Sequence, residues 1–400
     1  MRRRDLLLMP LAAGSDYFPP PDSRGGWRTL ANPADIRRRT GMDVEALEEA
    51  FRLIQQSTNN GGVLVARHGW LVFERYFGKG HREATPNLAS CGKPVTSIAV
   101  GILLAQRPDL FPDGLEQKIF APRYLPSVTF PLSDPRKAEI RLGQLLAMSA
   151  GIRGNNPSYV RGEKVRLDPE GPDGWSAMVD EMALGKQDGP RNAVTLWCEP
   201  GGGYSYATSS IHIASIVLRH VTGIELEQFV ARHMAQPLGW SRWGYGYKHA
   251  KLPHTPGGGG IALRATDVLR FAYLILRDGR WGHRQIAPAS YVRHCRAPSP
   301  FNPHFPYSLQ FNTNPGDIPG VPPDAVWKSG SGGHCFFVVP SLDLVAFKLG
   351  GRDGQYDPRD TGLPSAPSTS ETEPGWKASL NAETAERETL RLLVSAARET

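Results

Sequence analysis

The chain has 400 residues, of which 40% are hydrophobic and 21% charged, and its formal net charge at pH 7 is +7. This composition is typical of a globular protein with enough apolar surface for a sizeable core. The basic residues are scattered, with MRRR and IRRR as the only dense clusters, so we expect no nucleic-acid-binding stripe. No apolar run approaches about 18 residues, so we expect no integral membrane span.

Cysteine and histidine usage argues against metal and disulfide chemistry. The four cysteines are too few and too widely spaced for a disulfide framework or a Cys-x-x-Cys metal site. The histidines form no His-Glu-x-x-His or similar ligand spacing. We therefore expect free thiols, no metal ion and no cofactor.

Residues 1–25 combine a leader with an extended arm. The stretch MRRRDLLLMPLAAG has arginines, a short apolar patch and small residues, and it resembles an abbreviated twin-arginine export signal. The patch is interrupted by Pro10, so export to the periplasm and a cytoplasmic protein with a plain leader both stay open. Residues 15–41, rich in proline and glycine, predict an extended arm.

Residues 26–106 predict the first part of an α/β domain. MDVEALEEAFRLIQQS, residues 42–57, has apolar residues at helical spacing, with Asp43 able to cap the helix. VLVAR and WLVFERYF alternate between apolar and polar residues and are separated by His68-Gly69, which predicts a β-hairpin.

The segment NLASCGKPVTSIAVGILLAQ, residues 87–106, places Ser90 three residues before Lys93 at the start of an apolar helix. One interpretation is a helix cap followed by an ordinary solvated lysine. The other is chemical: residues three apart share a helix face, and a lysine among apolar side chains loses solvation, so that it can take a proton from the serine. Pro94 fits a first helical turn. The pattern alone does not decide between these two interpretations.

Residues 107–250 predict a mainly helical, loop-rich insertion, from patterns such as IRLGQLLAMSAG, GWSAMVDEMALG, IHIASIVLRHVTG and LEQFVARHMAQPLG. Tyr206 follows a run of three glycines, in a loop just before one of these helices. Taken by itself, it is typical of a packing tyrosine.

Residues 251–400 predict the rest of the α/β domain. ATDVLRFAYLILRDG, residues 265–279, reads as a helix with a capping threonine and a terminal glycine. Strands are expected in YSLQFNTN, DAVWKSG, HCFFVVPS and LDLVAFKLGG, a flexible loop over residues 353–376, and a last helix in NAETAERETLRLLVSAAR. The expected fold class is α/β (α+β), with one antiparallel sheet built from both chain ends and flanked by helices.

Lys328-Ser329-Gly330 stands at the end of a predicted edge strand. Exposed N–H groups and one positive charge there could face a substrate. The alternative is a lysine that protects a sheet edge from pairing.

Together, Ser90-x-x-Lys93, Tyr206-Ala207-Thr208 and Lys328-Ser329-Gly330 resemble, in order, the three motifs of the serine β-lactamase and penicillin-binding-protein superfamily. The sequence is most similar to the branch with class C β-lactamases, family VIII carboxylesterases and 6-aminohexanoate-dimer hydrolases, and the likeness covers most of residues 42–350. It implies a β-lactamase/transpeptidase-like fold.

The resemblance implies that Ser90 attacks a carbonyl carbon and forms an acyl-enzyme, with Lys93 and Tyr206 sharing the proton transfers. It implies an oxyanion hole from the backbone N–H groups of Ser90 and Ser331, with Lys328 and Ser329 orienting the substrate. His334 and Cys335 either line this site or fill the strand.

One position departs from the family pattern. Thr208 stands where the second motif has an asparagine, so a shorter hydroxyl replaces the amide, and this disfavours efficient turnover of β-lactams. The expected function is a serine hydrolase of small-molecule carboxylic esters or amides. A β-lactamase or D-peptide-directed hydrolase is the second hypothesis, and an inactive ligand-binding sensor is the third. The sequence leaves the natural substrate and the oligomeric state open.

Overall fold

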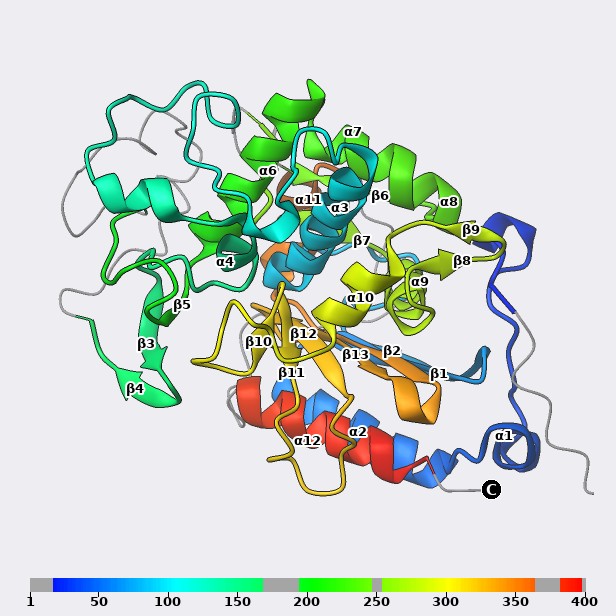
Figure 1. The fold of residues 1–400 in the computed structure, drawn as a ribbon. Coiled ribbons are helices and arrows are strands. Elements are labelled where there is room, and N and C mark those ends of the chain that lie inside the picture. Colours follow the sequence, from blue (N-terminus) through cyan, green and yellow to red (C-terminus); the bar gives the residue numbers. More distant parts are fainter. Residues whose placement is uncertain (1–16, 168–193, 247–253, 364–381, 398–400) are drawn as a thin grey trace, which may run out of the picture.

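A computed structural model describes residues 17–167, 194–246, 254–363 and 382–397. Its centre is a seven-stranded antiparallel sheet in the order β10-β11-β12-β13-β14-β1-β2 (Figure 1). The strands are β1 (Gly61–Arg67), β2 (Trp70–Phe77), β10 (Tyr307–Ser308), β11 (Phe311–Thr313), β12 (Val326–Gly330), β13 (His334–Val339) and β14 (Leu344–Leu349). The predicted sheet from both chain ends is confirmed, because β1 pairs directly with β14.

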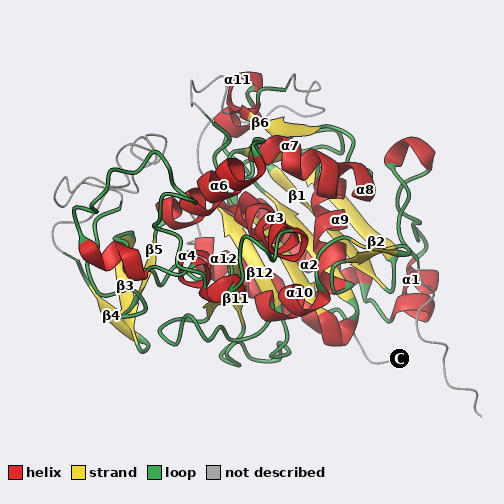
Figure 2. Ribbon diagram, turned by 45° about the horizontal axis from the view of Figure 1, so that its top comes forward, coloured by secondary structure: helices red, strands yellow, loops and turns green. Residues whose placement is uncertain are grey.

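The sheet is buried on both faces, and alternate residues of each central strand belong to different hydrophobic clusters. In β1, Leu64 and Ala66 face one cluster, whereas Val63 and Val65 face the other. Helices α2 (Val44–Ser57) and α12 (Ala382–Ser395) cover the second face. Helices α3 (Lys93–Gln106) and α9 (Ala265–Leu276) cover the first (Figure 2). Burial on both faces explains why the central strands β13 and β14 read as nearly continuous apolar runs.

The local predictions for the N-terminal half of this sheet are confirmed. The Asp43 side chain accepts hydrogen bonds from the backbone of Glu45 and Ala46, which caps α2. His68 and Gly69 both have positive φ angles, 52° and 74°, as a tight hairpin turn between β1 and β2 requires.

One strand was placed wrongly: β12, with the Lys-Ser-Gly triplet, lies inside the sheet between β11 and β13 rather than at its edge. Its ladder with β11 covers only Val326 and Trp327, however, while all five of its residues pair with β13. The last three residues of β12 therefore extend beyond the neighbouring strand, so they resemble an edge locally although the strand is internal.

The segment between residues 107 and 246 contains strands that the sequence did not predict. Its helices are α4 (Leu142–Leu146), α6 (Thr208–Thr222), α7 (Leu226–Val230) and α8 (Gln236–Leu238). A three-stranded sheet in the order β4-β3-β5 joins them, with β3 (Asn155–Val160), β4 (Glu163–Val165) and β5 (Tyr204–Tyr206). Strands β3 and β4 are short and mostly polar, and β5 has only three residues, so no alternating pattern of useful length marks them. The helix expected in GWSAMVDEMALG lies outside the described residues.

Smaller elements complete the chain. Strand β6 (Trp243–Tyr245) pairs with β7 (Ile261–Leu263), β8 (Arg280–Trp281) pairs with β9 (Arg284–Gln285), and α10 (Ala289–Cys295) follows. Two expectations fail here. Thr266 does not cap α9, whose N-cap residue is Arg264, and residues 353–363 form short helices, with α11 (Pro358–Thr361) among them, instead of an irregular loop.

The N-terminal arm contains a helix, α1 (Pro33–Thr40), that was expected to be extended. The Asn32 side chain accepts hydrogen bonds from Ala34 and Asp35 N–H groups, and Pro33 occupies the first helical position, so a capped start outweighs the surrounding glycines and prolines. The predicted leader, residues 1–14, lies outside the described residues.

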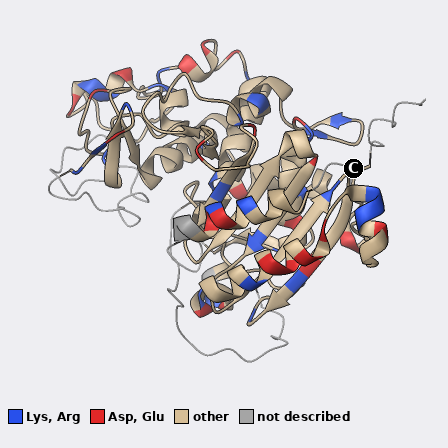
Figure 3. Cartoon of the chain, turned by 90° about the horizontal axis from the view of Figure 1, so that it is seen from below, with Lys and Arg blue, Asp and Glu red and all other residues tan. Residues whose placement is uncertain are grey.

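Charged residues of both signs are interspersed along the described chain (Figure 3). No helix within the described ranges has the length and apolarity needed to cross a lipid bilayer.

We predict that Asp22→Ala lowers the free energy of unfolding by about 2–4 kcal/mol. Asp22 pairs with Arg264 and, at 2.6 Å, with Arg270, whose side chain is fully buried. Removing the carboxylate leaves these guanidinium groups with less compensation inside the protein. Urea denaturation followed by circular dichroism measures the change. Asp109→Ala, which removes an exposed partner of Arg107, is the control with no measurable effect, and equal stability of the two variants would contradict the prediction.

Candidate active site

Ser90 lies in a short 3₁₀ turn (Ala89–Gly92) that leads directly into α3. The preceding residue, Ala89, has a φ of 48°, a left-handed conformation that is unusual for a residue other than glycine. The Asn87 side chain accepts a hydrogen bond from Ala89 N–H at 2.9 Å and stabilises this bend. Ser90 is therefore presented at the start of the helix on a strained backbone, with its side chain partly exposed.

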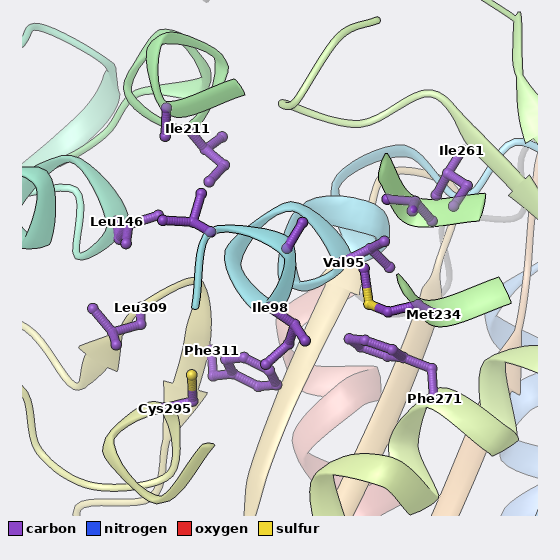
Figure 4. Packing of buried hydrophobic residues seen from close by; sticks show 14 of the residues in the cluster. Val95, Ile98, Leu146, Ile211, Met234, Ile261, Phe271, Cys295, Leu309 and Phe311 are labelled. Atoms are coloured by element: carbon purple, nitrogen blue, oxygen red, sulfur yellow. The ribbon is translucent and has the colours of Figure 1, made fainter. Parts of the chain in front are cut away.

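Lys93 is the first residue of α3 and is only 1% exposed. Its Nζ donates to Ser90 Oγ at 2.8 Å and to the carbonyl oxygen of Gly258 at 2.6 Å. Next to it, Val95 and Ile98 pack among buried side chains from several other elements (Figure 4). Lys93 is therefore buried beside Ser90, as the chemical interpretation requires, and it is not the solvated lysine of the alternative.

Tyr206 ends β5 and faces two ammonium groups. Lys328 Nζ donates to Tyr206 Oη at 3.0 Å and lies 4.5 Å from the centre of the ring, and Lys93 Nζ lies 5.3 Å from that centre. Burial by itself would raise the pKa of Tyr206, but the positive charges of Lys328 and Lys93, with hydrogen bonds from Ser90 and Lys328, lower it to about 8. A minor fraction of the phenol is therefore ionised at neutral pH, and most of it is ionised above pH 8.

The end of β12 lies against the turn that carries Ser90. A Cβ on Gly330 would lie 2.2 Å from Leu88 O and 2.7 Å from Cys91 N, so only glycine allows this approach. The Cys91 thiol donates to Lys328 O at 3.3 Å. These contacts fix the Lys-Ser-Gly segment beside the serine.

Gln355 is a residue that the sequence did not single out. Its Nε2 donates to the carbonyl oxygens of Asn87 and Ser331, each at 2.9 Å, while its own backbone oxygen accepts from Asn87 N–H at 2.8 Å. It therefore joins the segment before Ser90 to the turn after β12. No sequence signal marks it, because it lies in a region expected to be a loop and contacts backbone atoms only.

His334 and Cys335 fill the strand instead of lining the site. Both are fully buried in β13, and His334 Nδ1 accepts from Gly350 N–H at 3.1 Å. Burial, together with the charge of Lys348, lowers the pKa of His334 to about 3, so the imidazole is neutral. Lys348 is itself buried and donates to Gly333 O at 2.6 Å, which stabilises the turn after Ser331.

Two cavities meet at Ser90. The larger, about 640 Å³, includes Ser90 and most of the predicted binding residues among its lining: Tyr206, Lys328, Ser329, Gly330 and Ser331. The smaller, about 340 Å³, is lined by Ser90, Lys93, Thr208, Ser331 and the loop 258–260. The structure thus brings all the predicted site residues to one place. Among the described residues, no cluster of three or more His, Cys, Asp or Glu side chains is arranged to hold a metal ion.

Solved structures with the same fold include enzymes of several kinds. A candidate β-lactamase from Bacteroides dorei DSM 17855 has a TM-score of 0.58 at 18% identity, covering 78% of this chain and 91% of its own. A candidate 6-aminohexanoate-dimer hydrolase from Bacillus anthracis has a TM-score of 0.57 at 19% identity, and the match covers 87% of this chain and 85% of that protein. EstCE1, a hydrolase with promiscuous acyltransferase activity, has a TM-score of 0.58 at 18% identity, and the match covers 80% of this chain and 97% of EstCE1. At these identities, the likeness shows the fold.

No curated protein sequence matches the chain. The family model described as Beta-lactamase, in contrast, matches residues 40–363, most of the chain. That match spans the Ser90 turn, β5 and β12, and it confirms both the resemblance drawn from the motifs and the predicted serine-hydrolase class. The protein belongs to the beta-lactamase family.

Proposed function

We propose that the protein is a serine acyl hydrolase that cleaves carboxylic esters or small amides through an acyl-enzyme on Ser90. The observation that carries the proposal is a pair of hydrogen bonds beside one cavity: Lys93 Nζ contacts Ser90 Oγ at 2.8 Å, and Lys328 Nζ contacts Tyr206 Oη at 3.0 Å. This arrangement supports the proposed roles of a nucleophile, two proton carriers and a cation that favours the phenolate.

In the proposed reaction, the Tyr206 phenolate or Lys93 takes the hydroxyl proton as Ser90 Oγ attacks the carbonyl carbon. The same group returns the proton to the leaving alcohol or amine when the tetrahedral intermediate collapses. Water then attacks the acyl-enzyme, its proton passes to the same base, and Ser90 regains its hydrogen as the acid is released. Whenever Tyr206 is a phenolate, the positive charge of Lys328 stabilises it.

The proposed oxyanion hole uses the backbone N–H groups of Ser90 and Ser331. Two features support this assignment. Both residues line both cavities. The Gln355 side chain also donates hydrogen bonds to Asn87 O and Ser331 O, and it thereby joins the two segments that contain Ser90 and Ser331. Preorganised donors of this kind need no rearrangement when negative charge develops on the carbonyl oxygen.

A β-lactamase or D-peptide-directed hydrolase is the second candidate. Lys328 favours it, because an ammonium group at the end of β12 could bind a substrate carboxylate. Thr208 opposes it: this residue lines the smaller cavity beside Lys93, and its hydroxyl reaches less far than the asparagine amide of the family motif. Comparing nitrocefin with a simple ester distinguishes the two. An inactive sensor is disfavoured by the intact contact between Lys93 and Ser90.

We predict that the purified protein releases p-nitrophenol from p-nitrophenyl butyrate and that Ser90→Ala reduces the rate to background, a loss of at least about 10³-fold. The alanine variant lacks the attacking oxygen but keeps the fold. Ser57→Ala, at a buried serine at the end of α2 that lines neither cavity, is the control and should keep the wild-type rate. Turnover by Ser90→Ala at the wild-type rate would disprove the assignment.

We predict that kcat/KM for this ester rises with pH and levels off above a midpoint near 8, where Tyr206 loses its proton. Lys328→Met removes a positive charge next to the phenolate, so it should raise the pKa of Tyr206 and move the midpoint to higher pH. Ultraviolet titration should show one phenol ionising near pH 8 that is missing in Tyr206→Phe. An unchanged midpoint in Lys328→Met would contradict this account.

We predict that Gln355→Ala lowers kcat about tenfold or more with a smaller change in KM, because the two backbone donors lose their common support. Steady-state kinetics with p-nitrophenyl butyrate measures the effect. Gln285→Ala is the matched control: its amide also donates to two carbonyl oxygens, those of Asp278 and Ala287, away from the site. Equal losses in both variants would indicate a general effect on stability instead.

A further inference from the structure

One side of the larger cavity is made by aromatic rings that the proposed reaction does not use. We call Tyr159, Tyr204 and Phe305 the aromatic wall; all three line this cavity. Tyr204 and Tyr206 are two residues apart on β5 and so share one face of the small sheet, and Tyr159 on β3 is the direct partner of Tyr204. The sheet therefore carries the wall and Tyr206 on the same face.

The rings form a continuous row that leads away from the proposed nucleophile. Phe305 lies 4.5 Å from Tyr159 and 4.6 Å from Tyr204 between ring centres, and the planes of Phe305 and Tyr204 are inclined by only 15°. From Tyr204 the row continues through Tyr307 at 5.6 Å to Tyr206 at 6.3 Å. A group attached to a carbonyl at Ser90 would therefore meet ring surface along this side of the cavity.

Hydrogen bonds hold the wall in place before any ligand binds. On the opposite face of β5, Ser205 Oγ contacts Gly154 N–H at 2.8 Å and Ser158 Oγ at 2.9 Å. The segment with Phe305 is fixed by Asn302 Oδ1, which accepts from Phe305 N–H at 3.2 Å, and by His304 Nε2, which donates to Gly201 O at 2.8 Å. A rigid surface of this kind loses little conformational entropy on binding.

The wall also belongs to a hydrophobic cluster separate from the two cores of the sheet. Its buried members are Met148, Tyr204 and Tyr307, whereas Tyr159, Tyr206 and Phe305 are only partly buried and pack against them. Aromatic side chains that face a cavity with open ring surface are typical of sites for flat apolar groups. A purely structural cluster would not need its half-exposed rings to line the same cavity as Ser90.

We propose that the substrate carries a planar aromatic group on one side of the scissile bond, packed against Tyr159 and Phe305. The inference rests on the proposed function and specifies its substrate class: aryl-substituted esters or amides. The ring could belong to the acyl part or to the leaving group, and either placement uses the same recognition, offset or edge-to-face packing of a ligand ring on the wall.

The test compares rings that differ in planarity but hardly in size. Hydrolysis is followed by acid release for ethyl 3-phenylpropionate against ethyl 3-cyclohexylpropionate, and for 2-phenylethyl butyrate against 2-cyclohexylethyl butyrate. The wild type should prefer the phenyl member of at least one pair by about two- to tenfold in kcat/KM. The pair that shows the preference identifies the side of the scissile bond that carries the ring.

Two variants test whether the wall causes the preference. Tyr159→Leu and Phe305→Leu keep apolar volume but remove the ring, so the phenyl-to-cyclohexyl ratio should fall towards one in each. Phe130→Leu is the control: Phe130 is 38% exposed and lies outside the cavity lining, so the ratio should stay at the wild-type value.

Two results would overturn the proposal while leaving the serine hydrolase intact: turnover of ethyl butyrate without a phenyl preference in either pair, or a preference that survives in both leucine variants. If the wild type hydrolyses none of these esters, including ethyl butyrate, the proposed function fails, and the aromatic substrate class fails with it.

Discussion

The Lys93 side chain lies inside the protein, and three parts of the chain meet around it: the serine turn with α3, the loop with Gly258, and Tyr206 on β5. Removing an ammonium from water costs several kcal/mol unless hydrogen bonds compensate, and here Ser90 Oγ and Gly258 O accept from it. The second acceptor depends on the loop before β7, which is itself held by a hydrogen bond from Thr96 Oγ1 to Gly257 O at 2.8 Å. Folding of α3, the glycine loop and the serine turn is therefore coupled through one charge.

Close backbone approach is the second constraint on the site. Gly330 lies against the serine turn, and a Cβ on Gly258 would lie 2.4 Å from the Thr208 side chain. Glycines at these two positions let β12 and the loop reach α3 and α6 without displacing them. The charges of Lys93 and Lys328 can then act on the same phenol, although the two lysines are far apart in the sequence. The aromatic wall shares β5 with that phenol, so substrate contacts and proton transfer would be built on one small sheet.

Much of this arrangement could be predicted from sequence where a local pattern had a local cause. Asp43 before an amphipathic run, His68-Gly69 between alternating strands, and Ser90, Lys93 and Pro94 at the start of an apolar helix each depend on neighbouring residues only. The three motifs then linked distant segments because they resemble a family in a fixed order. The family assignment and the sheet from both chain ends agree with that reasoning.

The features that sequence missed depend on tertiary contacts. Nothing local in β12 shows that β11 covers only its first residues, so an internal strand was taken for an edge. The short polar strands β3 and β4 form because they pair with each other and with β5. Gln355 donates to a backbone carbonyl oxygen, and Gly258 accepts through its own. Every residue type has a backbone carbonyl, so no pattern of side chains identifies these two residues.

The most direct test of the central claim is the rate at which a fluorophosphonate labels the protein between pH 6 and 10, with the adduct located by peptide mass spectrometry. The account predicts a single adduct on Ser90 and a rate that rises with pH about a midpoint near 8, as Tyr206 becomes a phenolate beside its two lysines. An adduct on another residue, or a rate that does not change across this range, would contradict it.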